Sequence, residues 1–157
     1  MTMTLLAGPA GEPISRAEAK AYCRVDGDDE DALIDALIAA ARLQVESLTG
    51  RALLSQTWRY ERAGTQLCVE LPILPVASLV VAPDGATIQG DAVLLAAPED
   101  GVSIDYVAGY GGAEDVPADL KQAVLVLVAY WYENRDLATA PPLGFERLLA
   151  AYRRVRL

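Results

Sequence analysis

The stretch RVDGDDEDALIDALIAAA, residues 24–41, decides the fold because it carries the strongest helix signal in the chain. Five of the six residues from Asp26 to Asp31 are acidic, and the chain then turns apolar. Apolar residues recur at steps of three and four positions, the spacing of one helix face; they are Leu33, Ile34, Leu37, Ile38, Ala41, Val45 and Leu48. With Gly50 as a stop signal, the pattern predicts an amphipathic helix over about residues 29–49.

The acidic residues at the start of this stretch admit three interpretations: a calcium loop, a cluster of catalytic carboxylates or the first turn of the helix. An EF-hand loop starting at Asp26 needs glycine at its sixth position and glutamate at its twelfth. The chain has Asp31 and Leu37 there. We therefore interpret the acids as the helix start, with Asp28 capping a free backbone N–H and the next three acids favoured by the helix dipole.

The composition limits the classes of function. The chain has 157 residues, enough for one domain, and a net charge of −9, which argues against a general DNA-binding surface. It has no histidine, which excludes Ser-His-Asp and Cys-His catalysis and imidazole metal sites. Cys23 and Cys68 form no C-x-x-C motif and are expected as buried free thiols.

Neither a leader nor a membrane segment is indicated. The N-terminus, MTMTLLAGPAGEP, has no basic region followed by a long apolar one. The longest apolar stretch, residues 123–132, has ten residues and is too short to span a bilayer. We expect a soluble, intracellular protein with no membrane partner.

Two further helices and a β insert are predicted. Ser15 and Glu18 have the spacing of a capping box at the start of a helix over 16–23. Pro117 suits the first turn of a largely apolar helix over 118–135. Between them, residues 55–107 contain five short alternating segments, with a hairpin turn expected at 63–65; the strands are 56–62, 66–71, 77–82, 92–97 and 102–107.

The element order predicts an α+β protein: mainly a helical bundle, with a small inserted antiparallel β lobe and a C-terminal docking helix. We expect a domain over residues 1–142 and a tail over 143–157. The sequence AGYGG, residues 108–112, lacks the lysine and the spacing of a phosphate loop, and indicates a connection with positive φ. No catalytic, cofactor or metal residue is assigned, and we do not expect an enzyme.

Two segments are candidates for protein contacts. Tyr130, Trp131, Tyr132 and Arg135 are either core and helix end or a contact between subunits, and both interpretations stay open. Residues 146–157 carry a net charge of +3 against −12 for the rest of the chain. This tail is either a solvated amphipathic helix or a docking helix, and docking is favoured because so short a helix needs a partner for its apolar face.

Four segments resemble a known family: residues 18–53, LPILPVASL at 71–79, IDYVAGYGG at 104–112 and VPADLKQAVLVLVAYWYENRD at 116–136. In this order they are similar to the head–tail connector, or adaptor, proteins of long-tailed bacteriophages and of phage-derived gene transfer agents. The resemblance covers about residues 14–137.

The resemblance implies a ring, commonly of twelve copies, below the portal protein ring of the capsid. Such a ring extends the DNA channel and contacts a downstream neck (stopper) or tail protein, and an acidic surface suits a channel that DNA passes without specific binding. It assembles in the bacterial cytoplasm and then lies in the particle neck. The portal-binding residues implied by position are Phe145, Leu148, Leu149, Tyr152, Arg153, Arg154 and Arg156.

Two other classes stay open at this point. A small acidic protein-binding or DNA-mimic regulatory module would also have a net charge of −9 and no active site. An enzyme that uses carboxylates would need a metal or substrate pocket, and divalent-cation binding would reveal it.

Overall fold

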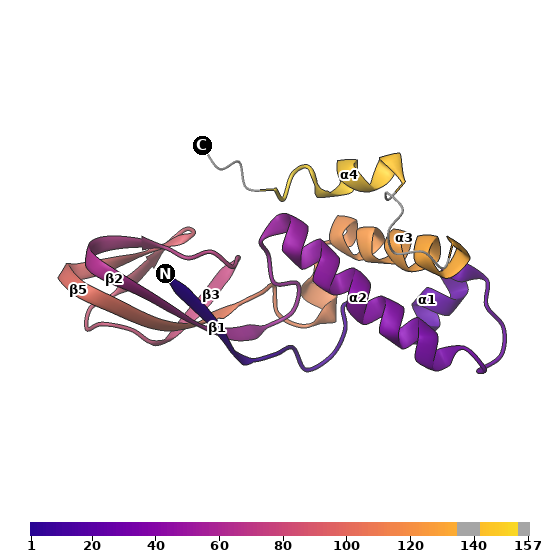
Figure 1. Ribbon diagram of the computed structural model, residues 1–157, viewed down its shortest axis with the longest axis horizontal. Coiled ribbons are helices and arrows are strands. Elements are labelled where there is room, and N and C mark those ends of the chain that lie inside the picture. The colour runs from indigo at the N-terminus through magenta and orange to yellow at the C-terminus, as the bar shows by residue number, and fades with distance from the viewer. Residues whose placement is uncertain (135–141, 154–157) are drawn as a thin grey trace.

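The computed structural model describes residues 1–134 and 142–153, and it has a helical part and a β lobe side by side along its longest axis (Figure 1). The chain passes from the helical part into the lobe after α2 and returns after β5. The elements are β1 (Thr2–Ala7), α1 (Arg16–Cys23), α2 (Asp31–Thr49), β2 (Gln56–Glu70), β3 (Val76–Val81), β4 (Thr87–Gln89), β5 (Ala92–Ala108), the 3₁₀ helix η1 (Ala113–Asp115), α3 (Ala118–Asn134) and α4 (Leu143–Leu149).

The protein is α+β, but it is not mainly helical, because helices and sheet have a similar share of the described residues. The short strands expected at 56–62 and 66–71 are one 15-residue strand, β2, and those at 92–97 and 102–107 are one 17-residue strand, β5. The predicted hairpin at 63–65 is therefore wrong. Gly64 and Gly101 have φ of 86° and 82° inside these strands, so they bend the ladder where the sequence suggested turns.

The sheet has the order β1-β2-β5-β3, and every pairing is antiparallel. β4 pairs with the first residues of β5, outside this path. β1 was not predicted; it joins β2 along the register Thr2↔Glu61 to Leu5↔Trp58. The lobe has its own buried cluster, which is Ala52, Tyr60, Val69, Leu71, Val93, Leu95, Val102, Ile104, Tyr106 and Ala108.

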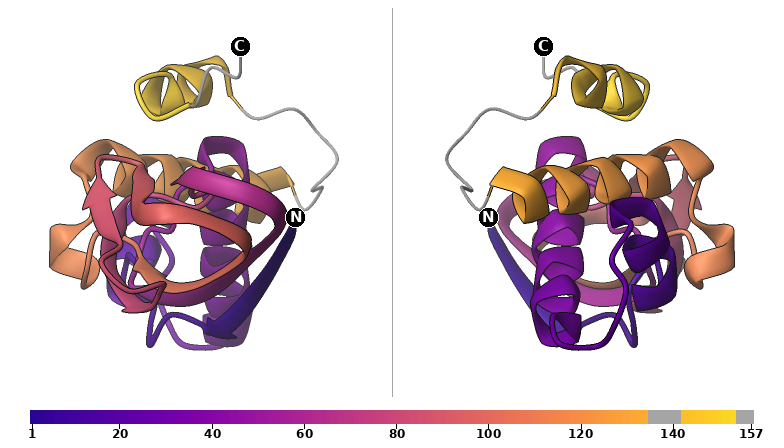
Figure 2. Two further views of the ribbon diagram at one scale, coloured as in Figure 1. Left: turned by 90° about the vertical axis from the view of Figure 1, so that its left-hand side faces the viewer. Right: turned by 90° about the vertical axis from the view of Figure 1, so that its right-hand side faces the viewer.

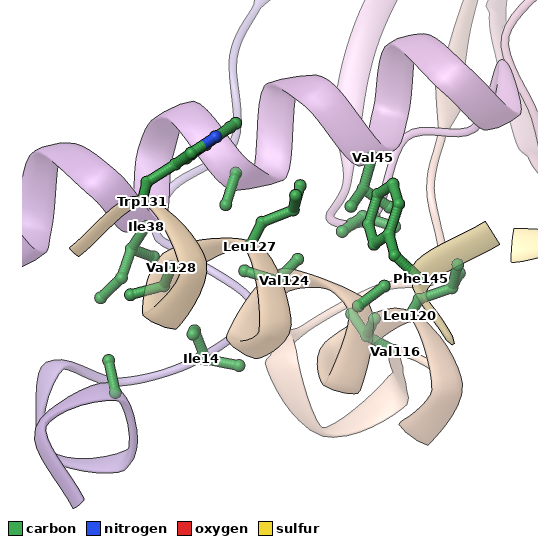
Figure 3. Packing of buried hydrophobic residues seen from close by; sticks show 14 of the residues in the cluster. Ile14, Ile38, Val45, Val116, Leu120, Val124, Leu127, Val128, Trp131 and Phe145 are labelled. Carbon is green, nitrogen blue, oxygen red and sulfur yellow. The ribbon is translucent and has the colours of Figure 1, made fainter. Parts of the chain in front are cut away.

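The larger core lies among α1, α2, α3 and α4 (Figure 3). The buried face of α2 contains fewer of its apolar residues than the sequence predicted. Ile34 and Ile38 are buried, but Leu33 is 42% exposed and Leu37 is half-buried. The capping box at Ser15 and the left-handed stop at Gly50 are confirmed.

The AGYGG segment makes the predicted connection with positive φ. Gly109 has a φ of 125°, and a Cβ there would lie 2.3 Å from the carbonyl oxygen of Leu54. Only glycine fits so close to the passing backbone. At Gly109 the chain leaves β5 close to the Leu54 backbone and then continues into the helical part.

Candidate functional site

Acidic residues just before α2 and in its first turns form an ion-pair network with α1. The Arg16 guanidinium donates to Asp31 at 2.8 Å and to Asp35, and the Lys20 ammonium donates to Asp28 at 2.9 Å and to Asp31 at 2.8 Å. The predicted cap by Asp28 is wrong, because the helix starts after Glu30 without a side-chain cap and Asp28 binds Lys20 instead.

The network favours the ionised form of the Asp31 and Asp35 carboxylates. Hydrogen bonds from Lys20 and Arg16 hold the pKa values of Asp31 and Asp35 below the usual range, and the pKa of Lys20 is raised by the same contacts. In the described residues no three His, Cys, Asp or Glu side chains are grouped as metal ligands. The acids therefore hold α1 against α2.

The tail helix α4 packs on the helical part of its own chain. Phe145 and Leu149 are fully buried, and Phe145 lies beside Val45, Leu120 and Val116 (Figure 3). The other two apolar residues of the predicted docking face, Leu148 and Tyr152, are half-buried at the edge of this core. The apolar face thus has a partner within the chain.

Arg51 holds the end of the tail. Its Nε donates to the carbonyl oxygen of Tyr152 at 3.2 Å, and its guanidinium carbon lies 5.7 Å from the centre of the Tyr152 ring. A second guanidinium nitrogen donates to the Tyr110 hydroxyl at 3.2 Å. Burial raises the pKa of Tyr152. Arg153 pairs with Glu146 at 2.6 Å, whereas Arg154 and Arg156 lie outside the described residues.

The aromatic run at the end of α3 divides into three environments. Trp131 is 9% exposed in the core, and the Tyr132 hydroxyl donates to the Glu30 carboxylate near the start of α2. Tyr130 is half-buried and lines a shallow hollow with Tyr22 and Pro142. Arg135 lies outside the described residues. Among the described aromatic residues of the run, Tyr130 and Tyr132 are half-buried and Trp131 is buried, so only the two tyrosines offer surface to another subunit.

The two cysteines and the hydrophobicity of the helices were also part of the sequence predictions. Cys23 is half-buried, but Cys68 is exposed on β2, so the prediction of two buried thiols is wrong for Cys68. Within residues 1–134 and 142–153, none of the helices combines the length and hydrophobicity that crossing a membrane requires.

Comparison with known proteins identifies the family. A family model described as phage gp6-like head-tail connector protein matches residues 15–140. The chain belongs to this connector family. The family is structural and not enzymatic, so the resemblance noted in the sequence and the expectation that the protein is not an enzyme are confirmed. No curated protein matches the chain.

Solved structures of gene transfer agent (GTA) particles contain chains similar to this connector. One is from the neck of an empty GTA particle computed with C6 symmetry, with 27% identity and a TM-score of 0.85. A second, from the virion of a native particle, has 27% identity and a TM-score of 0.84. A third, from the neck of a native particle computed with C12 symmetry, has 29% identity and a TM-score of 0.75. Each match covers 100% of this chain and 97% of the other.

Sequence reasoning missed the site that joins the two parts of the connector. Glu46 of α2 accepts hydrogen bonds at 2.8 Å from the Leu53 backbone N–H, the Gln56 side chain and Arg42. Arg42 also binds Glu12, which precedes α1. Burial raises the pKa of Glu46, against the opposing effect of these donors. The signal in the sequence that could have pointed to this site is Arg42 and Glu46, a charged pair four residues apart on the predicted helix.

Proposed function

We propose that this connector forms a ring, commonly of twelve copies, below the portal protein ring of a phage or phage-like particle. The ring extends the DNA channel and binds the next neck or tail protein. The observation that carries the proposal is the full-length similarity to chains from GTA particles, one of them in a neck computed with C12 symmetry. The subunit assembles in the bacterial cytoplasm and then lies in the particle neck.

The tail binds the portal with two sets of residues in this proposal. Phe145 and Leu149 position α4, since both are fully buried in the connector's own core. Leu148, Tyr152 and Arg153 are accessible for contact, and Arg154 and Arg156 extend the basic charge. A basic, partly apolar segment suits an acidic groove on a partner protein.

The charge distribution supports a channel role. Without residues 146–157 the chain has a net charge of −12. Because binding to DNA depends mainly on cationic contacts to phosphate, an acidic ring lets DNA pass without holding it. A ring of this kind needs no base-specific contacts.

Co-sedimentation with the purified portal ring of the same particle tests the role of the tail. We expect the full chain to sediment with the portal, and Leu148→Asp combined with Tyr152→Asp to lose at least tenfold in binding. Two carboxylates would be placed in an apolar contact and would repel an acidic groove. The matched control, Leu148→Met with Tyr152→Phe, keeps the size and the apolar surface of both side chains and should bind like the original chain.

A synthetic peptide of residues 142–157 separates a binding defect from a folding defect. If the tail docks, excess peptide displaces the full chain from the portal. A folded double-Asp variant that still binds, together with a peptide that does not compete, would place the portal contact elsewhere on the connector. Failure of the full chain to bind at any salt concentration would favour the small acidic binding module.

A further inference from the structure

The two outer strands of the sheet are open. β1 pairs only with β2, and β3 has β5 as its strand partner, so each keeps one edge without a strand among the described residues. The two strands do not contact each other. Seen along the long axis, they lie on opposite flanks of the lobe (Figure 2). The lobe therefore presents two separate edges.

Both edges lack the charges that usually protect a strand from another chain. β1 reads TMTLLA and β3 reads VASLVV, six residues each with no charged side chain. Leu5 and Leu6 are 47% and 45% exposed, and Val80 and Val81 are 57% and 58% exposed. Natural proteins commonly place lysine or proline in such strands to prevent pairing. Register shifts in both strands limit the length of any pairing, so the uncharged edges together with these exposed apolar side chains indicate a short partner strand.

The directions of β1 and β3 allow the two edges of neighbouring copies to pair. Because each neighbour in the order β1-β2-β5-β3 is antiparallel, β3 runs opposite to β1. A second copy in the same orientation thus brings its β1 antiparallel to β3 of the first. Contacts between two different surfaces, repeated by rotation, close a ring. The edges meet the geometric need of a cyclic assembly.

The surroundings of the edges are also complementary. An apolar groove beside β1 is lined by Leu5, Leu43, Trp58 and Ile73 among others, and Leu43 is 57% exposed. Exposed Arg62 follows Glu61, the partner of Thr2 at the start of β1. Exposed Asp84 follows the end of β3. Antiparallel pairing brings Asp84 to the end where Arg62 lies, but the exposed Glu61 lies there too, so the fit of the two edges comes from the apolar groove.

We propose that β3 of one copy pairs with β1 of the next copy and so joins neighbouring subunits of the ring. The pairing places Thr4 beside Ser78, so Val80 lies beside Thr2 at the start of β1. Leu5, with the groove behind it, lies beside Ala77 and Val76. β3 carries two register shifts against β5, so the pairing is short and side-chain burial supplies much of the contact. This inference rests on the proposed ring and names the surface that closes it.

Cysteine cross-linking of the full chain, assembled on the portal ring, tests the pairing. Thr4 and Ser78 are exposed and lie inside the two edges. In a background with Cys23→Ala and Cys68→Ser, the variant carrying both Thr4→Cys and Ser78→Cys should give a ladder of linked copies with a short bis-maleimide. Each single variant should stay monomeric, because a contact between different edges needs both thiols. Moving the second thiol to β4, as Thr4→Cys with Thr87→Cys, is the matched control and should reduce the ladder at least tenfold.

A second variant tests the same contact without a cross-linker. Val80→Lys with Val81→Lys changes only exposed side chains, so the subunit should melt like the original but lose ring closure. Ile88→Lys on β4, at a residue 38% exposed, should leave ring closure unchanged.

Several results would overturn the pairing. Dimers from Thr4→Cys alone would show β1 pairing with itself, and links to the portal would show another occupant of the edge. Normal rings from the double-Lys variant, or a complete ring by electron microscopy without any ladder, would also exclude it. In those last cases portal binding persists, so the adaptor function stands. A ladder from a chain that does not bind the portal would support the pairing and contradict the proposed adaptor function.

Discussion

At the scale of single residues, Glu46 connects more of the molecule than any side chain singled out in the sequence. Its side chain is 13% exposed, and its carboxylate accepts hydrogen bonds from the backbone N–H of Leu53, from Gln56 at the start of β2, and from Arg42 in its own helix. Removing it leaves the Leu53 backbone N–H and the Gln56 side chain without this acceptor in a partly buried place, while Arg42 keeps Glu12. Such groups cost more when left unpaired than the bond contributes when made.

Glu46→Ala should therefore lower the free energy of unfolding by about 2–4 kcal/mol. Urea unfolding followed by circular dichroism measures the change. Glu70→Ala, at an exposed position on β2, is the control and should stay within about 0.5 kcal/mol. Equal, small effects of both variants would show that Glu46 does not join the two parts.

The pair between Arg59 and Asp105 links β2 to β5 and gives a pH dependence. Arg59 donates to the two carboxylate oxygens of Asp105 at 2.7 and 2.8 Å and holds the pKa of Asp105 below its usual range. A lowered pKa in the folded state means that the ionised form stabilises the fold. This stabilisation is present above the unfolded-state pKa, about 4, and is lost as pH falls through the lower folded-state pKa.

Asp105→Asn should consequently lower stability at pH 7 and reduce the further loss on acidification to pH 3. Urea midpoints at both pH values give the comparison. The original chain and the variant losing equal stability between pH 7 and pH 3 would rule out this contribution.

At the scale of elements, the sequence predicted helices better than strands. The spacing of apolar residues and the signals at Ser15 and Gly50 located α1, α2 and α3, because these signals are local. β2 and β5 were each divided at a glycine, since a glycine between alternating segments has the same appearance as a turn. β1 was missed because a short strand is fixed by its partner, here β2, which lies more than fifty residues away in the chain.

The two faces of α2 provide a test at this scale. Ile38 is buried and Leu33 is 42% exposed, although both lie in the predicted apolar face. Ile38→Ala should cost about 2–4 kcal/mol through the cavity it leaves, whereas Leu33→Ala should cost less than about 1 kcal/mol. Chemical denaturation of both variants measures the two losses of unfolding free energy. A larger loss for Leu33→Ala than for Ile38→Ala would mean that the helix buries a different face.

The attachment of α4 depends on Phe145. A seven-residue helix is too short to persist alone, so removing its largest buried side chain should detach it while α1, α2 and α3 stay folded. In Phe145→Ala, trypsin should cleave after Arg147 at least tenfold faster, with the main unfolding transition retained. Ala150→Ser, at an exposed position just after α4, is the control. Loss of the entire transition in Phe145→Ala would show that α4 is integral to the domain.

At the scale of the whole molecule, the sequence supported the α+β class and the connector family, but not the balance between the two parts. The share of sheet was underestimated because five short strands read as a small insert, while the long strands build a lobe with its own core. The tail shows a second limit of sequence-based prediction, which concerns where a binding partner lies. Its apolar face predicted a partner, and periodicity has no information on whether that partner is the same chain or another.

Arg51 has a mechanical consequence for the assembled subunit. Its backbone bridges to Leu74, two residues before β3, while its side chain holds the last described turn of the tail. Among the described residues, Arg51 ties the Tyr152 backbone to the lobe, so a pull on the C-terminal end should load this contact before the buried residues of α4. Under tension the chain should therefore yield in steps, first at Arg51, then at Phe145 and Leu149, with the two cores last. A subunit built in this way absorbs small movements of its neighbour at its periphery and keeps its folded body intact.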